Sequence, residues 1–335
     1  MELTFLFADV LGKPAWMWLA FIGIVLFLLV FDLGVLHREN RAIGVTESLI
    51  MSGVYISLGL IFGGWVWWYL GPEHGMNYMT GFAVEKALAM DNVFVIALIF
   101  AFFAIPRHLQ HRVLFWGILG VIALRAIMIG VGATIVAEFS WVLYFFAVFL
   151  IMTGVKMIIT ADKVYDVAHN PVLRLVRRRL NVTGGLHGER FLVRLPDPAT
   201  GKPTLFMTPL FLALILIEIA DVVFAVDSVP AIFAITTDPF IVYTSNIFAI
   251  LGLRALYFAL AAMVHRFHYL KYALALVLIF IGSKIFLADI LGLEKFPPIL
   301  SLSITFGLLI GGVVWSLRKT RAAVPADGEN VPASR

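Results

Sequence analysis

Apolar runs of about twenty residues recur along the chain, separated by short polar breaks, and this is the length that a helix needs to cross a bilayer. A soluble core would instead alternate apolar and polar faces. The pattern predicts an all-α, polytopic membrane protein. We expect nine transmembrane helices, at residues 16–36, 49–70, 79–104, 114–133, 141–159, 209–235, 241–264, 269–291 and 298–317.

The composition agrees with a membrane protein. Of the 335 residues, 61% are hydrophobic and 14% are charged, well above and below the respective shares of soluble domains. The absence of cysteine excludes disulfides, thiolate metal sites and cysteine nucleophiles. The net charge of +4 does not indicate nucleic-acid binding, because the basic residues map to one side of a membrane.

Most lysines and arginines lie in alternate breaks, which begin at residues 37, 106, 160 and 265, and in the tail after residue 317. The opposite breaks and the N-terminus carry only Lys13 and Lys295. Because cytoplasmic loops are enriched in basic residues, the C-terminus is expected to be cytoplasmic and the N-terminus outside.

The longest polar segment, 161–208, contains four arginines between residues 174 and 179 and turn residues from 196 to 202. It predicts a short amphipathic helix and a hairpin on the inner surface. Two roles stay open: its basic residues set topology and contact lipid headgroups, or the segment senses or gates. The tail, 322–335, is predicted to be disordered.

An internal repeat organises the spans. Glu85 and Asp91 match Asp221 and Asp227 at an offset of 136, the Leu-Arg-Ala of 124–126 recurs at 253–255, and the Gly-x-Lys of 154–156 recurs at 282–284. Each copy holds three spans, so the second copy enters the membrane from the opposite side, as in transporters with inverted repeats.

The predicted organisation is therefore a two-helix extension (1–78), a first three-helix repeat (79–160), a cytoplasmic basic loop (161–208), a second, inverted three-helix repeat (209–292), a C-terminal helix (293–321) and the tail.

Five acids lie in the interior of predicted spans, away from the span ends, where an ionised side chain costs roughly 2.5 to 3.5 kcal/mol on insertion scales. Such residues usually face a partner or a watery path. With two neutral neighbours they form our candidate ion site: Glu85, Asp91, Asn92, Glu218, Asp221, Asp227 and Ser228.

One straight helix would not gather all three acids of the span 209–235. Glu218 and Asp221 are neighbours on one face, whereas Asp227 is rotated from Asp221 by about 120° and displaced by about 9 Å. Pro230 leaves the carbonyl of Val226 without its usual donor, so we expect the span to unwind or kink beside Asp227.

Carboxylate, amide, hydroxyl and backbone oxygens favour a hard divalent cation such as Mn²⁺, Mg²⁺ or Ca²⁺. Five bases in the spans are candidate charge partners or proton relays: Lys86, Arg125, Lys156, Arg254 and Lys284. A purely structural network of these acids and bases is the alternative, although buried ion pairs stabilise poorly compared with apolar residues.

Exporting a divalent cation from a negative interior costs about 4.6 kcal/mol per 100 mV. The chain has no phosphate-binding loop with the Gly-x4-Gly-Lys-Ser/Thr pattern. Protons taken up by shared carboxylates are therefore the natural coupling ion.

The sequence resembles the TerC (tellurium resistance) family of integral membrane proteins, including its Alx-type manganese exporters. The resemblance rests on Glu85-Lys86 with 90–94, on 218–234, and on 236–240 and 245–255. It implies manganese efflux across a bacterial inner membrane, with Glu85, Asp91, Glu218, Asp221 and Asp227 at the acidic positions associated with transport. The family also includes proteins linked to tellurite resistance and to metal loading of secreted enzymes.

We therefore expect a secondary transporter that exports Mn²⁺ as its substrate, without enzymatic activity or a resident cofactor. Export of another small cation or amino acid, and a non-transporting role in metallation of secreted proteins, stay open. An intramembrane aspartyl protease would use Asp91 and Asp227, but its Tyr-Asp and Gly-x-Gly-Asp contexts are missing. The lipid bilayer is the expected partner, and the sequence leaves homo-oligomer formation open.

Overall fold

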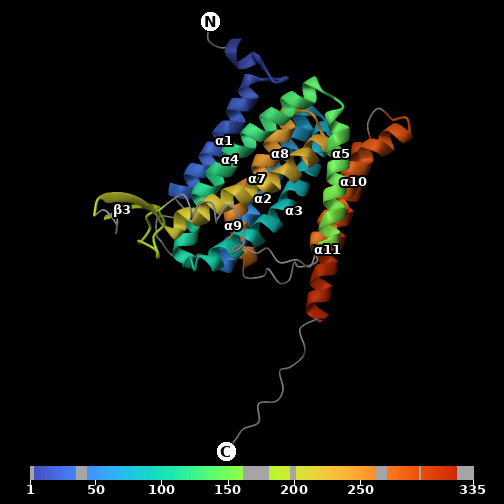
Figure 1. The fold of residues 1–335 in the computed structure, drawn as a ribbon. Helices are drawn as coiled ribbons and strands as arrows, with labels where there is room; N and C mark the ends of the chain where they lie inside the picture. The colour runs from blue at the N-terminus through green and yellow to red at the C-terminus, as the bar shows by residue number, and fades with distance from the viewer. Residues whose placement is uncertain are drawn as a thin grey trace, which may run out of the picture.

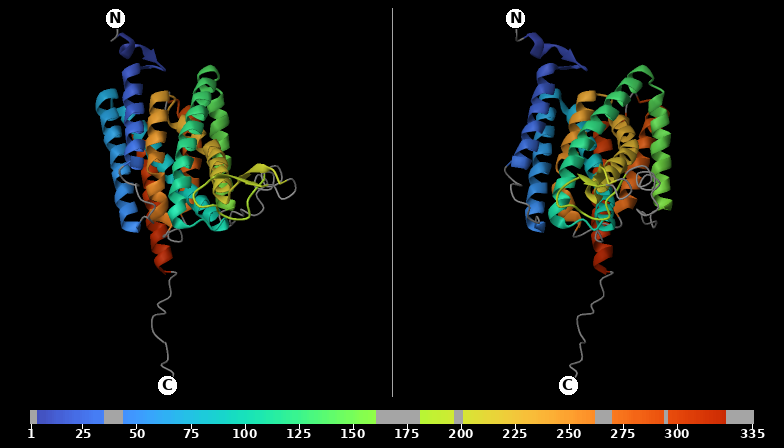
Figure 2. Two further views of the ribbon diagram at one scale, coloured as in Figure 1. Left: turned by 90° about the vertical axis from the view of Figure 1, so that its left-hand side faces the viewer. Right: turned by 60° about the vertical axis from the view of Figure 1, so that its left-hand side comes forward.

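The protein is a bundle of long helices, with the start of α1 and the end of α11 at opposite ends (Figure 1). This computed structural model describes residues 4–34, 44–160, 181–196, 201–261, 270–293 and 296–322. Figure 2 shows the helices running roughly parallel or antiparallel to one another, with a small hairpin at the side of the bundle.

The helices of the described residues follow the apolar runs. Their bounds are α1 Ala15–Gly34, α2 Val45–Leu70, α3 Pro72–Phe102, α4 Arg107–Glu138, α5 Val142–Ile159, α7 Pro209–Ile235, α8 Pro239–Leu251, α9 Leu253–Ala261, α10 Leu270–Ile290 and α11 Pro298–Ala322. Mostly helical structure confirms the expected class.

Six of these helices are long and apolar enough to cross a membrane: α2, α4, α5, α7, α10 and α11. The apolar stretches of α1 and α8 are shorter, and α3, which carries four charged residues, is not among the six. The count of nine spans therefore stays a prediction.

Large apolar side chains cover the outside of the bundle. Trp68 on α2, Ile159 on α5 and Ile290 on α10 are 81%, 77% and 78% exposed, respectively. Exposed apolar surface of this extent marks a membrane or protein interface in a folded chain. It agrees with a bundle whose outer surface faces lipid.

Helix α7 is helical without interruption from Pro209 to Ile235, with Pro230 inside it. Of the two outcomes predicted beside Asp227, unwinding is therefore wrong, and a kink at Pro230 stays a prediction. The break falls instead in the next predicted span, where Gly252 separates α8 from α9. The fixed φ of proline is itself helical, so Pro230 costs α7 the hydrogen bond to the carbonyl of Val226 and brings its ring close to that carbonyl, and the helix continues through both.

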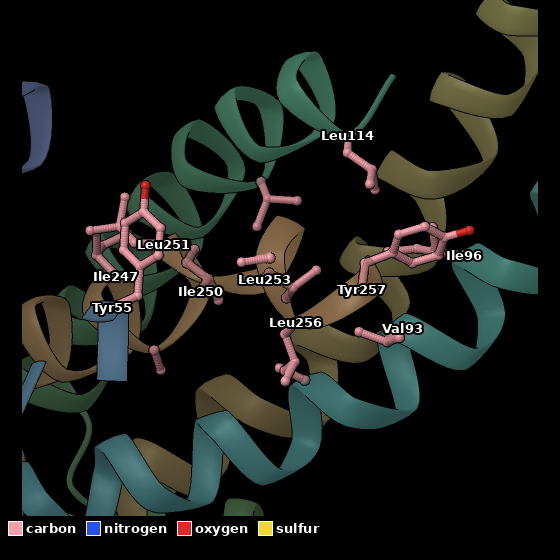
Figure 3. Packing of buried hydrophobic residues seen from close by; sticks show 14 of the residues in the cluster. Tyr55, Val93, Ile96, Leu114, Ile247, Ile250, Leu251, Leu253, Leu256 and Tyr257 are labelled. Carbon is pink, nitrogen blue, oxygen red and sulfur yellow. The ribbon is translucent and has the colours of Figure 1, made fainter. Parts of the chain in front are cut away.

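The join between α8 and α9 lies in the main apolar core. Figure 3 shows Ile250, Leu253 and Leu256 between α3, which contributes Val93, and α4, which contributes Leu114. All five side chains are buried. This packing holds the break in the middle of the bundle.

Helices α5 and α10 cross with reciprocal contacts. A Cβ added to Gly154 would lie 2.6 Å from the carbonyl oxygen of Ala275. A Cβ on Gly282 would lie 2.6 Å from that of Ala147. Both pairs are related by 128 residues, the offset of the Gly-x-Lys repeat. The two helices therefore meet about an approximate twofold axis.

Two short hairpins lie at the edge of the bundle. Strands β3 (Leu192–Pro196) and β4 (Pro203–Met207) pair antiparallel, which confirms the hairpin predicted in this segment. Near the N-terminus, a 3₁₀ turn (Thr4–Phe7) precedes β1 (Asp9–Val10) and β2 (Lys13–Pro14), which also pair antiparallel. The predicted basic helix near 174–179 and the tail from 323 lie outside the described residues.

The α5–α10 crossing predicts a steric penalty at Gly282. Gly282→Ala should lower the free energy of unfolding in detergent by about 1–3 kcal/mol, because the methyl group must push a backbone carbonyl away. Gly311→Ala on α11, where an added Cβ meets no atom within 4 Å, is the control. Equal stability of the two variants would contradict the close crossing.

Candidate functional site

Charged side chains from three helices meet around Arg125 in the middle of the bundle. Arg125 of α4 is 1% exposed. Its Nη1 group donates to Glu85 Oε1 of α3. Its Nη2 and Nε groups donate to the two carboxylate oxygens of Asp221 on α7, at 3.3 and 3.4 Å. One guanidinium thus binds two buried carboxylates.

Neutral polar groups complete this cluster, which we call the Arg125 cluster. Arg125 Nη1 also donates to Ser228 Oγ at 3.2 Å and to Asn246 Oδ1 at 3.0 Å. The amide nitrogen of Asn246, on α8, donates to Glu85 Oε2 at 3.0 Å. Asn92 Nδ2 donates to Asp221 Oδ1 at 3.4 Å.

The spacing of these residues explains why they share one face of each helix. Glu85 and Asn92 are seven residues apart on α3, as are Asp221 and Ser228 on α7. Seven residues make about two turns, so each pair points in nearly the same direction. Each helix supplies one carboxylate and one neutral polar group at equivalent positions of the sequence repeat.

Glu218 lies beside the Arg125 cluster without belonging to it. Its carboxylate interacts electrostatically with Asp221, one turn away. It rests against Gly120 of α4, where an added Cβ would lie 2.1–2.5 Å from the carboxylate atoms. Its Oε2 is buried and has no hydrogen-bond partner among the described residues.

Asp227 faces a different neighbour, as its rotation from Asp221 predicts. Its Oδ1 accepts a hydrogen bond from Thr153 of α5 at 3.2 Å, and Lys156 of α5 interacts with it electrostatically. The side chains of Asp91 and Arg254 lie outside the described part of the structure. The structure therefore brings together only some of the predicted site residues: Glu85, Asn92, Arg125, Asp221 and Ser228.

Among the described residues, no group of three or more acidic, histidine or cysteine side chains is placed to hold a metal ion. Ligands for a cation at the Arg125 cluster would thus be two carboxylates plus neutral oxygens. This set fits a hard divalent cation, and Mg²⁺, for example, is commonly held in proteins by one or two carboxylates.

Lys86 hydrogen-bonds a helix end, and it also interacts electrostatically with Glu85. Its Nζ donates to the carbonyl oxygen of Ala249 at 2.8 Å, in the last turn of α8. A cation is favourable at the carboxyl end of a helix. A Cβ on Gly252 would lie 2.8 Å from the Cβ of Tyr55 and 3.2 Å from this Nζ, so the glycine leaves room for both side chains.

Two cavities lie on either side of the cluster along the bundle. The smaller, about 30 Å³, extends from Asn92 and Asp221 between apolar side chains such as Ile96 and Leu114. This volume is enough for about two water molecules.

The larger cavity, about 580 Å³, is a polar vestibule where α3, α8 and α11 begin. Glu73, His74, Asp238 and Asp289 are among its lining residues. Lys284 also lines it, is 6% exposed and donates to Ser301 Oγ at 3.3 Å.

Sequence reasoning missed Asn246, which binds both Arg125 and Glu85. Its signal is the polar pair Ser245-Asn246 within an otherwise apolar stretch. Both side chains are fully buried, and a buried amide needs hydrogen-bond partners.

The chain matches the model of the integral membrane protein TerC family over residues 70–323. It is 48% identical over 300 residues to an uncharacterized membrane protein of Rickettsia bellii, covering 90% of this chain and 96% of that protein. It is 46% identical over 318 residues to an uncharacterized membrane protein of Myxococcus xanthus, covering 95% and 97%.

A third relative, from Escherichia coli, is named as a candidate membrane-bound redox modulator, Alx. It is 42% identical over 311 residues, which cover 90% of this chain and 94% of that protein. No solved structure matches the chain. The family match and the relatives together confirm that this chain belongs to the TerC family of integral membrane proteins.

Proposed function

We propose that the protein is a secondary active transporter that exports Mn²⁺ from the cytoplasm in exchange for protons. The observation that carries this proposal is the convergence of Glu85 and Asp221, from separate helices, on one point in the apolar bundle. Ionised groups are expensive at this depth, and where they occur they commonly mark ion pathways.

The chemistry of the donors supports a hard divalent substrate. The Arg125 cluster presents carboxylate, amide and hydroxyl oxygens, and the chain contains no cysteine to favour a softer metal. Asn92 Oδ1, at the edge of the cluster, is buried and has no hydrogen-bond partner among the described residues. The resemblance to manganese exporters favours Mn²⁺ among the hard divalent ions.

Two inverted three-helix units would provide alternating access. The reciprocal contacts of α5 and α10 support this arrangement, because matched positions of the two sequence copies exchange the same contacts. Helix α3 also packs against α8 while α7 packs against α4, so each unit's first helix contacts the other unit's second. A substrate site between such units lies near the membrane midplane.

Proton coupling follows from the direction of transport. Exporting a divalent cation against 100 mV costs about 4.6 kcal/mol. Glu218 and Asp227 lie outside the Arg125 cluster, and neither forms a salt bridge with a described base within the ion-pair distance. We assign the entering protons to these carboxylates.

The redox name of the relatives does not indicate a thiol mechanism for this chain, because the chain contains no cysteine. A non-transporting protein that assists the metallation of secreted proteins would move no Mn²⁺ across the membrane itself. Reconstitution of the purified protein separates these roles, since only a transporter moves Mn²⁺ across a sealed vesicle.

Neutralising acids of the predicted ion site should reduce manganese flux. In proteoliposomes with the internal pH monitored, Asp221→Asn, Asp91→Asn and Asp227→Asn should each reduce Mn²⁺ flux about tenfold or more, the equivalent of about 1.4 kcal/mol in a rate barrier. Flux of Ca²⁺ and Mg²⁺ serves as the selectivity comparison.

Glu189→Gln is the matched control for these acids. Glu189 is 43% exposed and binds Arg112 outside the Arg125 cluster, so its neutralisation should leave flux unchanged. Unaltered manganese flux in Asp221→Asn, Asp91→Asn and Asp227→Asn alike would remove the proposed site.

The proposed orientation places the N-terminus outside and the basic hairpin in the cytoplasm. The cysteine-free chain allows single-cysteine variants without background labelling. A membrane-impermeant maleimide should label Asp9→Cys in intact cells and Arg194→Cys only after permeabilisation, because both side chains are exposed and the proposed topology places them on opposite sides of the membrane. The reverse pattern would invert the topology.

A further inference from the structure

We propose that Arg125 is a tethered cation: its guanidinium occupies the ion's place in the empty transporter and leaves the carboxylates when Mn²⁺ binds. This inference rests on the proposed function. It assigns Arg125 a part in the transport cycle beyond neutralising acids, namely to compete with the substrate for the same oxygens.

The geometry of the guanidinium supports this competition. It donates hydrogen bonds to oxygens of four residues on three helices: Glu85, Asp221, Ser228 and Asn246. These are the carboxylate, hydroxyl and amide donors that a hard cation takes. Arginine stays protonated in proteins. Entry of a second cation therefore requires the guanidinium to move, because it cannot be neutralised.

Glu218 provides a second partner for the displaced guanidinium. It lies one turn before Asp221 on α7 and rests against Gly120, on the same helix as Arg125. Its Oε2 is buried without a described hydrogen-bond partner. A buried acceptor without a donor is unfavourable in this conformation. A guanidinium transferred there would satisfy this oxygen and free Glu85 and Asp221 together.

The tethered cation explains how the empty transporter can change conformation. If neither Mn²⁺ nor Arg125 bound them, the two carboxylates of the cluster would be unpaired inside an apolar bundle while the protein changes conformation. Leaving a buried charge unpaired in this way is strongly unfavourable. With Arg125 in place, at least one of these charges is compensated. Net export requires this return step, whereas exchange of Mn²⁺ for Mn²⁺ does not, because the site is loaded in both directions.

The test compares these two modes in proteoliposomes. Arg125→Met should reduce net Mn²⁺ flux about tenfold or more, since the empty return step loses its cation, while radioactive Mn²⁺ exchange at saturating manganese on both sides continues. Arg125→Lys retains a cation and should keep the ratio of net flux to exchange near that of the wild type. A purely structural arginine would lose both modes in parallel, and that result would overturn the inference.

Lys86→Met is the matched control, because Lys86 is also a buried cation of the bundle but binds the carbonyl of Ala249. Its substitution should change net flux and exchange in the same proportion. If Arg125→Met does not fold, the decision rests on Arg125→Lys: net flux and exchange that both persist at the wild-type ratio support the inference, whereas loss of both fluxes in a folded protein overturns it. Wild-type protein without manganese flux would overturn the proposed function itself.

Discussion

The structure depends on placing several charges inside an apolar bundle. Removing a carboxylate or guanidinium from water is expensive, and mutual attraction offsets this only when the geometry also satisfies the remaining hydrogen-bonding groups. Arg125 meets this condition with its Nε, Nη1 and Nη2 groups all engaged. Because its partners come from α3, α7 and α8, the cluster fixes the relative positions of four helices at one point.

Glycine controls how closely polar atoms approach this point. Gly120 leaves space for the carboxylate of Glu218, and Gly252 leaves space for the ammonium of Lys86. Lys86 in turn binds the carboxyl end of α8, the helix that carries Asn246. These glycines thus determine where the charged side chains can lie. Composition alone would not indicate this role.

The sequence predicted the apolar helices well because the bilayer imposes a length and a composition on each. Its bounds for α7 agree with the structure, and the separation of Asp227 from Asp221 followed from helix geometry. Its errors and gaps concern tertiary choices. Pro230 did not unwind α7, and the actual break at Gly252 carries no proline, so it could not be distinguished from an ordinary glycine in a helix. The carbonyl partner of Lys86 belongs to a helix end that the sequence did not reveal.

The two sides of the Arg125 cluster differ in ways that bear on the proposed cycle. The vestibule at the N-terminal end is large and polar, whereas the cavity beyond Asn92 is small and largely apolar. A hydrated cation would lose its water shell readily only where polar groups replace it. Of these two cavities, the small one is lined by Asn92 and Asp221 of the cluster, whereas the vestibule is lined by none of the cluster's residues, so in this conformation the cluster meets only the small cavity.

The bonds of the cluster also cross between the two proposed units. Arg125 and Glu85 belong to the first unit, and Asp221, Ser228 and Asn246 to the second. Relative movement of the units must break or exchange these bonds, so the occupant of the carboxylates and the conformation of the protein would be coupled at this position. Packed apolar residues would stabilise the boundary between the two units as well as buried ion pairs do. Stability alone therefore does not explain why the cluster spans this boundary.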